Sequence, residues 1–329
     1  MNRKMERRTT EDQIDIVISW VDGNDPDHKR KIDAYRSGQK YSKADDVAGK
    51  TRFANNGEIN FCVASINRYA DFVRQIFIIT DGQDPCLDEF INKHFDNPVP
   101  VRIIDHKTIF EGYEEYLPTF NSRAIEALLW RIPGLSERFV YMNDDFLLTA
   151  PCTLDDFFIG ENTVCYADWY STLFARTLRW IKPKKKGHKP IGFKDSMLNA
   201  LDIIGSGPKF LYLAHSPRAL RKSFYEDFFK EHEDVLIRNI RHKFRHAEQY
   251  NSQELFYMTE YRNGRCVVRS PKQYGMYLKP KKRKNYIADK LESFRRKPHA
   301  LFCCFNSLDQ ASADDRNMVN DWIMDRLSL

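Results

Sequence analysis

Apolar runs alternate with segments of helical periodicity along the first 150 residues. Three short runs, Ile14–Trp20, Gln75–Thr80 and Val99–Ile104, are typical of buried strands. Between them, Ile59–Tyr69 places apolar residues at positions 59, 62, 63, 66 and 69, and Leu87–Phe95 is a second candidate helix. This alternation predicts an α/β fold with a Rossmann-like, mostly parallel sheet flanked by helices.

A fourth strand leads into an acidic sequence. Phe139–Met142 is apolar, Asn143, Asp144 and Asp145 follow, and apolar residues resume at once. Adjacent carboxylates at the end of a buried strand are costly unless a positive charge lies beside them. Two interpretations fit: a solvated turn between two strands, or a site where a divalent cation holds a phosphate group.

Polar residues also follow the other predicted strands. Asp22 lies beyond the first strand, Asp81 follows the second, and His106 follows the third. In parallel α/β sheets, ligands bind outside the carboxyl ends of the strands. We therefore expect these residues to border one cleft together with Asn143–Asp145.

The second half of the chain is less regular and more helical. Leu211–Leu213 predicts a short strand that runs into His215. Lys222–Phe244 predicts one long amphipathic helix that ends beside Arg245, and Met318–Leu327 predicts a terminal helix.

Composition narrows the class of protein. The 329 residues are 42% hydrophobic and 30% charged, which is ordinary for a globular chain with a sizeable core. No apolar window approaches a membrane span, and the charged N-terminus lacks the apolar stretch of a secretory signal. Seven cysteines without a Cys-x-x-Cys pair argue against a disulfide framework and suit a reducing cytoplasm.

The net charge of +6 is concentrated in two basic runs, Lys182–Lys189 and Lys279–Lys284. Such runs are usually solvated loops, but they also fit a polyanionic partner such as a phosphorylated glycan, anionic lipid headgroups or nucleic acid. Because the runs lack closely interleaved aromatic residues and no nucleic-acid-binding motif occurs, we expect no nucleic-acid partner.

Glu126 is a candidate third carboxylate. It lies near the start of a helix that Ser122 is expected to cap and that should run to about Ile132, directly before the strand with the acidic pair. Glu126 either complements the positive end of this helix or faces the cleft as a cation ligand.

Three more residues have a structural and a chemical interpretation. His215 is either a hydrogen-bonded structural residue or a catalyst, and Asn306 is either a helix cap or a ligand-binding residue. Arg245 either complements a helix C-terminus or neutralises a phosphate. No Walker motif or Gly-x-Gly-x-x-Gly occurs, which disfavours a P-loop kinase and a dinucleotide dehydrogenase.

Four sequence blocks spread over residues 14–309 share a family likeness. They are Ile14–Pro26, a long block from Arg52 to Asp145, the pair Ala214–Pro217 and Lys243–Arg245, and Phe305–Asp309. Together they resemble the Stealth proteins, the capsular polysaccharide phosphotransferases of bacteria, which are similar to the lysosomal N-acetylglucosamine-1-phosphotransferase. The chain departs from the family pattern in two places. The family usually has Asp-Asn-Gly-Glu-Leu where this chain has Ala54-Asn55-Asn56-Gly57-Glu58-Ile59, and Ser307 follows Asn306 where the family usually has aspartate.

The resemblance implies transfer of a sugar 1-phosphate, from hexose or N-acetylhexosamine, out of a UDP-sugar donor. The acceptor would be a hydroxyl of a polysaccharide or oligosaccharide, the product a phosphodiester in a capsular or surface polysaccharide, and the leaving group UMP. It also implies a core like that of GT-A glycosyltransferases. Residues 1–150 would bind the nucleotide sugar and metal, and residues 151–329 would bind the acceptor and complete the active site within the same catalytic domain.

The resemblance further implies roles for single residues. Glu126, Asp144 and Asp145 would hold Mg²⁺ or Mn²⁺, and His215 would take the acceptor proton or stabilise the transferred group. The remaining catalytic residues implied are Asp22, Asp144 and Arg245. The implied substrate-binding residues are Asp22, Arg52, Asn56, Asn121, Ser122, Asn143, Arg245 and Asn306.

Two other functions stay open at this stage. A metal-dependent glycosyltransferase would use the same kind of donor but release UDP. A non-catalytic protein would bind glycan or membrane through the basic runs. We expect a cytoplasmic enzyme, in peripheral contact with the inner face of the membrane or with the capsule assembly machinery.

Overall fold

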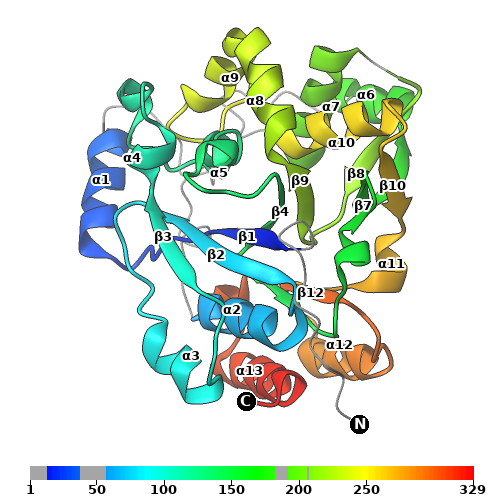
Figure 1. The fold of residues 1–329 in the computed structure, drawn as a ribbon. Coiled ribbons are helices and arrows are strands. Elements are labelled where there is room, and N and C mark those ends of the chain that lie inside the picture. Colours follow the sequence, from blue (N-terminus) through cyan, green and yellow to red (C-terminus); the bar gives the residue numbers. More distant parts are fainter. Residues whose placement is uncertain (1–12, 38–56, 182–191, 206) are drawn as a thin grey trace.

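The computed structural model describes residues 13–37, 57–181, 192–205 and 207–329 (Figure 1). Its central sheet has the strand order β3-β2-β1-β4-β9. The strands are β1 (Ile14–Ser19), β2 (Val73–Thr80), β3 (Val101–Asp105), β4 (Arg138–Asn143) and β9 (Arg218–Arg221). The first four run parallel and β9 runs antiparallel to β4, so the predicted mostly parallel sheet is confirmed.

The central sheet has an apolar core on each face. Successive side chains of a strand point to opposite faces, so each strand contributes to both cores. Ile16 and Ile18 of β1 belong to one apolar core, and Val17 belongs to the other. The first core includes side chains of α2 (Glu58–Tyr69), α3 (Asp88–His94), α12 (Tyr286–Arg295) and α13 (Ala313–Leu327). The second includes side chains of α4 (His106–Ile109), α5 (Ser122–Glu126), α7 (Phe193–Ile204), α8 (Lys222–Glu231), α9 (Glu233–Ile240) and α10 (Ser252–Arg262).

Two smaller sheets complete the described fold. One joins β10 (Cys266–Arg269), β7 (Asn162–Ser171) and β6 (Phe158–Ile159), with β8 (Lys209–Leu213) also paired to β7. The other has the order β11-β12-β5, formed by β11 (Gly275–Leu278), β12 (Phe302–Phe305) and β5 (Phe146–Leu148). Strand β9 enters the central sheet from the second half of the chain, and β5 joins the first half to β12. The remaining helices are α1 (Pro26–Ser37), α6 (Thr172–Ile181) and α11 (Pro271–Tyr274).

Two helix predictions are wrong. Asn121, and not Ser122, caps α5 by accepting a hydrogen bond from the Arg123 amide, and α5 already ends at Glu126. The long helix expected over 222–244 is two helices, α8 and α9, because His232 between them has non-helical dihedrals (φ −131°, ψ 57°).

Candidate active site

The acidic pair lies where the order of the parallel strands reverses. The chain runs outward from β1 through β2 to β3 and then returns to β4 on the other side of β1. Asn143 pairs with Ser19, so the carboxyl ends of β1 and β4 are neighbours. Such a switch point is where open α/β sheets bind ligands, and Asp144 and Asp145 form the turn that follows β4 here.

Strand β12 supplies the partners of Asp145. The amide of Phe305 donates to the Asp145 carbonyl oxygen at 3.0 Å. Asn306 Nδ2 lies 3.4 Å and Cys304 Sγ 3.5 Å from Asp145 Oδ2. The other carboxylate oxygen, Oδ1, is buried and has no hydrogen-bond partner among the described residues. Asn306 is thus brought to the acidic pair from 161 residues away.

The charges around the pair are unbalanced. Burial raises the pKa of Asp145 to about 6, although contacts with Cys304 and Asn306 oppose the shift and Glu58 adds to it. Burial, Asp145 and Glu58 together raise the pKa of Asp144 well above its usual value. Glu58, in the first turn of α2, was missed as a site residue; the only signal was its place in the Arg52–Asp145 block.

These groups fit a hard divalent cation. Mg²⁺ and Mn²⁺ prefer carboxylate oxygens, and Asp145 Oδ1 is a buried oxygen without a hydrogen-bond donor. A cation bound there would also relieve the repulsion between Asp144 and Asp145. Among the described residues, no group of three carboxylates that includes Asp144 and Asp145 has ligand atoms that all lie within 4.8 Å of one another. Asp144 and Asp145, which are adjacent in the turn after β4, are therefore the core of the candidate metal site.

Glu126 faces arginines. Burial raises the pKa of Glu126, while Arg245, Arg123 and Arg218 lower it, with the largest effect from Arg245 and the smallest from Arg218. Its Oε1 atom lies 3.3 Å from the hydroxyl of Tyr141, which also lies 2.9 Å from Asn143 Oδ1. Tyr141 therefore lies between the carboxylate turn and a glutamate that interacts with three arginines, the residue type that binds phosphate through its guanidinium group.

The loop after α9 holds Arg245 close to α5. Arg245 Nη2 donates to Ser122 Oγ at 3.1 Å. Asn121 is buried, caps α5, and donates to the carbonyl oxygen of His242 at 3.0 Å and to Gln249 Oε1 at 2.9 Å. The structure therefore brings Arg245 and Ser122 together at the site, whereas the Asn121 amide caps α5 through its oxygen and holds the loop through its nitrogen.

His215 lies in the turn between β8 and β9. Its imidazole is stacked between Phe193, with centroids 5.8 Å apart, and Tyr277, at 5.0 Å. His215 is exposed, but the partial loss of surrounding water, with Arg218 and Lys279 nearby, lowers its pKa to about 4. Tyr277 pairs with Cys304, the neighbour of Asp145, so one aromatic ring connects His215 with the acidic pair.

The other expected site residues lie farther along the sheet edge. Asp22 Oδ1 accepts from the Asn24 amide at 2.8 Å, and the backbone of Asp22 is bonded to the Gln83 side chain. Asp81 pairs with Lys31 at 2.8 Å. Although burial opposes it, His28 and Lys31 lower the pKa of Asp81, and burial lowers that of His106 to about 4. These polar groups thus form local networks at the strand ends, while Arg52 and Asn56 lie outside the described residues.

Comparison with known proteins gives consistent matches. Two family models match, Stealth protein CR1, conserved region 1, over residues 12–40, and Stealth protein CR2, conserved region 2, over residues 52–166. The capsular polysaccharide phosphotransferase cps1A of Actinobacillus pleuropneumoniae is 30% identical over 85% of this chain and 77% of its own length. The exopolysaccharide phosphotransferase SCO6023 of Streptomyces coelicolor is 30% identical over 77% of this chain. The match covers 41% of the length of that relative.

Solved structures of glycosyltransferases are also similar. The galactosyltransferase LgtC in complex with donor and acceptor sugar analogs has a TM-score of 0.46 at 13% identity and covers 96% of this chain and 95% of its own. The bifunctional glycosyltransferase WbbM has a TM-score of 0.48 at 12% identity and covers 96% of this chain and 51% of its own.

Proposed function

Because the chain belongs to the Stealth family of capsular and exopolysaccharide phosphotransferases, we propose that it transfers a sugar 1-phosphate from a UDP-sugar to a glycan hydroxyl. The observation that carries this proposal is the pairing of opposite charges across Tyr141. Carboxylates that suit a divalent cation lie on one side, and Arg245, Arg123 and Arg218 lie around Glu126 on the other. Phosphoryl transfer needs mainly such positioning and charge neutralisation.

The proposed reaction forms one bond and breaks one bond. The acceptor oxygen attacks the phosphorus that carries the sugar, and the bond from that phosphorus to the UMP oxygen breaks. The sugar C1–O bond remains intact, so the anomeric configuration is retained. The acceptor proton passes to the exposed imidazole of His215, which is neutral at pH 7 because its pKa is about 4.

Each charged group has a role in this scheme. Asp144 and Asp145 would hold Mg²⁺ or Mn²⁺, which when bound neutralises diphosphate charge. Arg245 would donate to a phosphate oxygen, and Glu126 would orient it from behind. Asn306 would keep the Asp145 carboxylate in place, while Asp22, Arg52, Ser122 and Asn143 remain proposed contacts to the donor. The functional division into halves 1–150 and 151–329 is part of the same proposal.

Helix α6 suggests where the enzyme works. Within the described residues no helix has the length and apolar character to cross a bilayer. Leu173, Phe174, Trp180 and Ile181 of α6 nevertheless expose apolar side chains, with 83% of Trp180 accessible. The basic run Lys182–Lys189 follows directly in the sequence. Apolar and cationic groups in succession suit an anionic lipid surface, so we propose that α6 contacts the inner face of the cytoplasmic membrane.

The identity of the released nucleotide tests the reaction. A panel of UDP-hexoses and UDP-N-acetylhexosamines would be incubated with oligosaccharide acceptors and Mg²⁺ or Mn²⁺. Release of UMP with a new phosphodiester signal in ³¹P NMR supports the proposal. Release of UDP would instead establish the alternative, a metal-dependent glycosyltransferase, and no turnover with any pair would favour a glycan-binding protein.

A further inference from the structure

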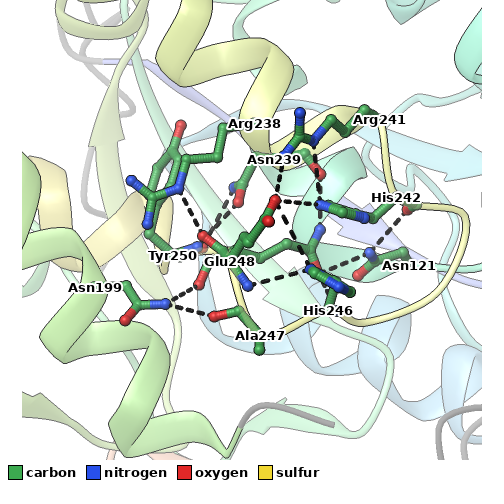
Figure 2. Close-up of polar contacts among 11 residues, drawn as sticks. Asn121, Asn199, Arg238, Asn239, Arg241, His242, His246, Ala247, Glu248 and Tyr250 are labelled. Carbon is green, nitrogen blue, oxygen red and sulfur yellow. Dashed lines mark hydrogen bonds and ion pairs between the residues drawn. The ribbon is translucent and has the colours of Figure 1, made fainter. Parts of the chain in front are cut away.

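A second group of ligand-type side chains lies on the loop between α9 and α10. His242, His246 and Glu248 converge there, apart from the acidic pair (Figure 2). In the described part of the chain, this is the one group of at least three His, Cys, Asp or Glu residues whose ligand atoms all lie within 4.8 Å of one another. The proposed reaction assigns none of the three a role.

The ligand atoms are spaced as a metal ion requires. His242 Nε2 lies 3.3 Å and His246 Nδ1 lies 3.9 Å from Glu248 Oε2. The two imidazole rings are nearly parallel, with centroids 4.0 Å apart and an interplanar angle of 13°. Around a tetrahedral zinc ion with Zn–N bonds of ~2.0–2.1 Å, ligand atoms lie about 3.3 Å apart. Because a histidine binds a metal in the plane of its ring, one of the two imidazoles must rotate out of the stack to bring all three atoms to one ion.

We propose that His242, His246 and Glu248 form a Zn²⁺ site. Two imidazole nitrogens and one carboxylate oxygen are a borderline donor set that favours zinc over the hard cations Mg²⁺ and Mn²⁺. A water molecule would complete the coordination. Zinc here and a hard cation at Asp144 and Asp145 would be separate ions.

Two donors compete with the ion: the Glu248 amide, which donates to His246 Nδ1 at 3.3 Å, and Arg241. Its guanidinium pairs with Glu248, and its Nε lies 3.4 Å from His242 Nε2. Both side chains of the Arg241–Glu248 pair are almost half exposed, so the pair contributes little to stability. The long Arg241 side chain can turn toward solvent or toward the second Glu248 oxygen when a cation takes the first.

The position of the site gives the ion a consequence for Arg245. Arg245 lies between the two histidines in the chain, and its guanidinium donates to Ser122 Oγ. The same loop is bonded to the α5 segment through Asn121, which donates to the His242 carbonyl oxygen. An ion that joins His242 to His246 would hold the loop on both sides of Arg245. This consequence, unlike zinc binding itself, rests on the proposed function.

Metal titration tests the site without a turnover assay. Untagged protein is stripped with a chelator and titrated with Zn²⁺ in excess Mg²⁺, so that hard-cation sites are filled, and with Co²⁺ to record the absorption of a tetrahedral site. One equivalent should bind to the wild type, and it should be lost in His242→Ala, His246→Ala and Glu248→Gln. His232→Ala, which removes a histidine that contacts Phe228 outside the cluster, is the matched control and should keep it.

Arg241→Ala separates a metal site from an ion-pair network. Without this competitor, zinc should bind at least as tightly as in the wild type. A wild type that binds no zinc, or ligand variants that retain the equivalent, would overturn the site. If zinc binds but His246→Ala leaves the donor KM unchanged, the link to Arg245 is overturned and the site stands. Absence of UMP release by zinc-loaded wild type would overturn only the proposed reaction.

Discussion

The hydroxyl of Tyr141 lies 3.3 Å from Glu126 Oε1. This contact connects β4, the strand that leads into the acidic pair, to α5, the helix that ends at Glu126. The same hydroxyl lies 2.9 Å from Asn143 Oδ1. Tyr141 thus lies between the two charged groups of the proposed site, because its hydroxyl contacts both Glu126, which we propose orients Arg245, and Asn143, the residue before Asp144.

Tyr141→Phe should lower kcat/KM for the donor by about tenfold, since a hydrogen bond to a charged group contributes ~1.5 kcal/mol or more. The protein should still fold, because the ring and its packing remain. Steady-state kinetics and a thermal melt measure both effects. Tyr250→Phe, which removes an equally buried hydroxyl bonded to Val235, is the control and should keep full activity. Equal kinetics in the two variants would remove Tyr141 from the site.

Asp145→Asn should reduce turnover at least about a hundredfold, because a bound cation supplies several kcal/mol of charge stabilisation. Mg²⁺ or Mn²⁺ should raise the Tm of the wild type by mass action and leave that of the variant unchanged. Asp309→Asn, which changes a neighbouring carboxylate of the Phe305–Asp309 block, should respond like the wild type. An active Asp145→Asn enzyme, or one still stabilised by these cations, would contradict the metal site.

The same carboxyl group should make stability depend on pH when divalent cations are removed. The folded protein holds the Asp145 proton up to about pH 6, whereas the unfolded chain releases it near pH 3.8. The wild type should therefore lose stability relative to Asp145→Asn as pH rises from about 4 to 6. The variant should be more stable at pH 7 by on the order of 2 kcal/mol, since Asp145 keeps some exposure, and the difference should vanish below pH 4.

Urea unfolding in EDTA at pH 4, 5, 6 and 7 measures this difference. Asp309→Asn again serves as the control and should track the wild type at each pH. The prediction would be contradicted if the difference in stability between the wild type and Asp145→Asn is the same at all four pH values. The surroundings of Asp145 would then not raise its pKa.

His215→Ala should lower kcat at least about a hundredfold if the imidazole accepts the acceptor proton. When Mg²⁺ or Mn²⁺ is saturating, so that protonation of Asp145 does not limit activity, the pKa of about 4 also predicts that kcat/KM of the wild type declines near pH 4, and not near 6.5. His215→Phe keeps a ring between Phe193 and Tyr277 and controls for the stack. Activity restored by phenylalanine would show that only the stacking matters.

The protein should bind vesicles that contain anionic lipid, and it should do so through helix α6. Replacing Phe174 and Trp180 with serine should weaken sedimentation with such vesicles several-fold and leave kcat on a soluble acceptor unchanged, because both side chains point to solvent. Ile103→Ser on β3 removes an apolar side chain that is also exposed but lies outside α6, and it should have no effect. Wild-type binding to the vesicles should fall with added salt. The membrane proposal would be contradicted if the wild type does not bind, or if the Phe174 and Trp180 replacements bind as well as Ile103→Ser.

The sequence by itself determined the local elements of the first half and the position of the acidic pair. Apolar runs and helical periodicity located β1, β2, α2, α3 and β4, because these patterns report which face of an element is buried. Placement of Asp144 and Asp145 after a strand followed from the same pattern. Helix ends were less well determined: Asn121 instead of Ser122 caps α5, and His232 divides the helix expected over 222–244.

Only the tertiary structure decided which residues meet. Asn306 reaches Asp145 because β12 pairs with β5. His215 comes close to the same residues because it stacks on Tyr277 of β11, which pairs with β12. Glu126 turns to the arginines, and Glu58 lies nearer the acidic pair, which no local pattern indicates. The physical reason is that periodicity depends on neighbours in the chain, whereas a site depends on strand pairing and on charges brought together from distant segments.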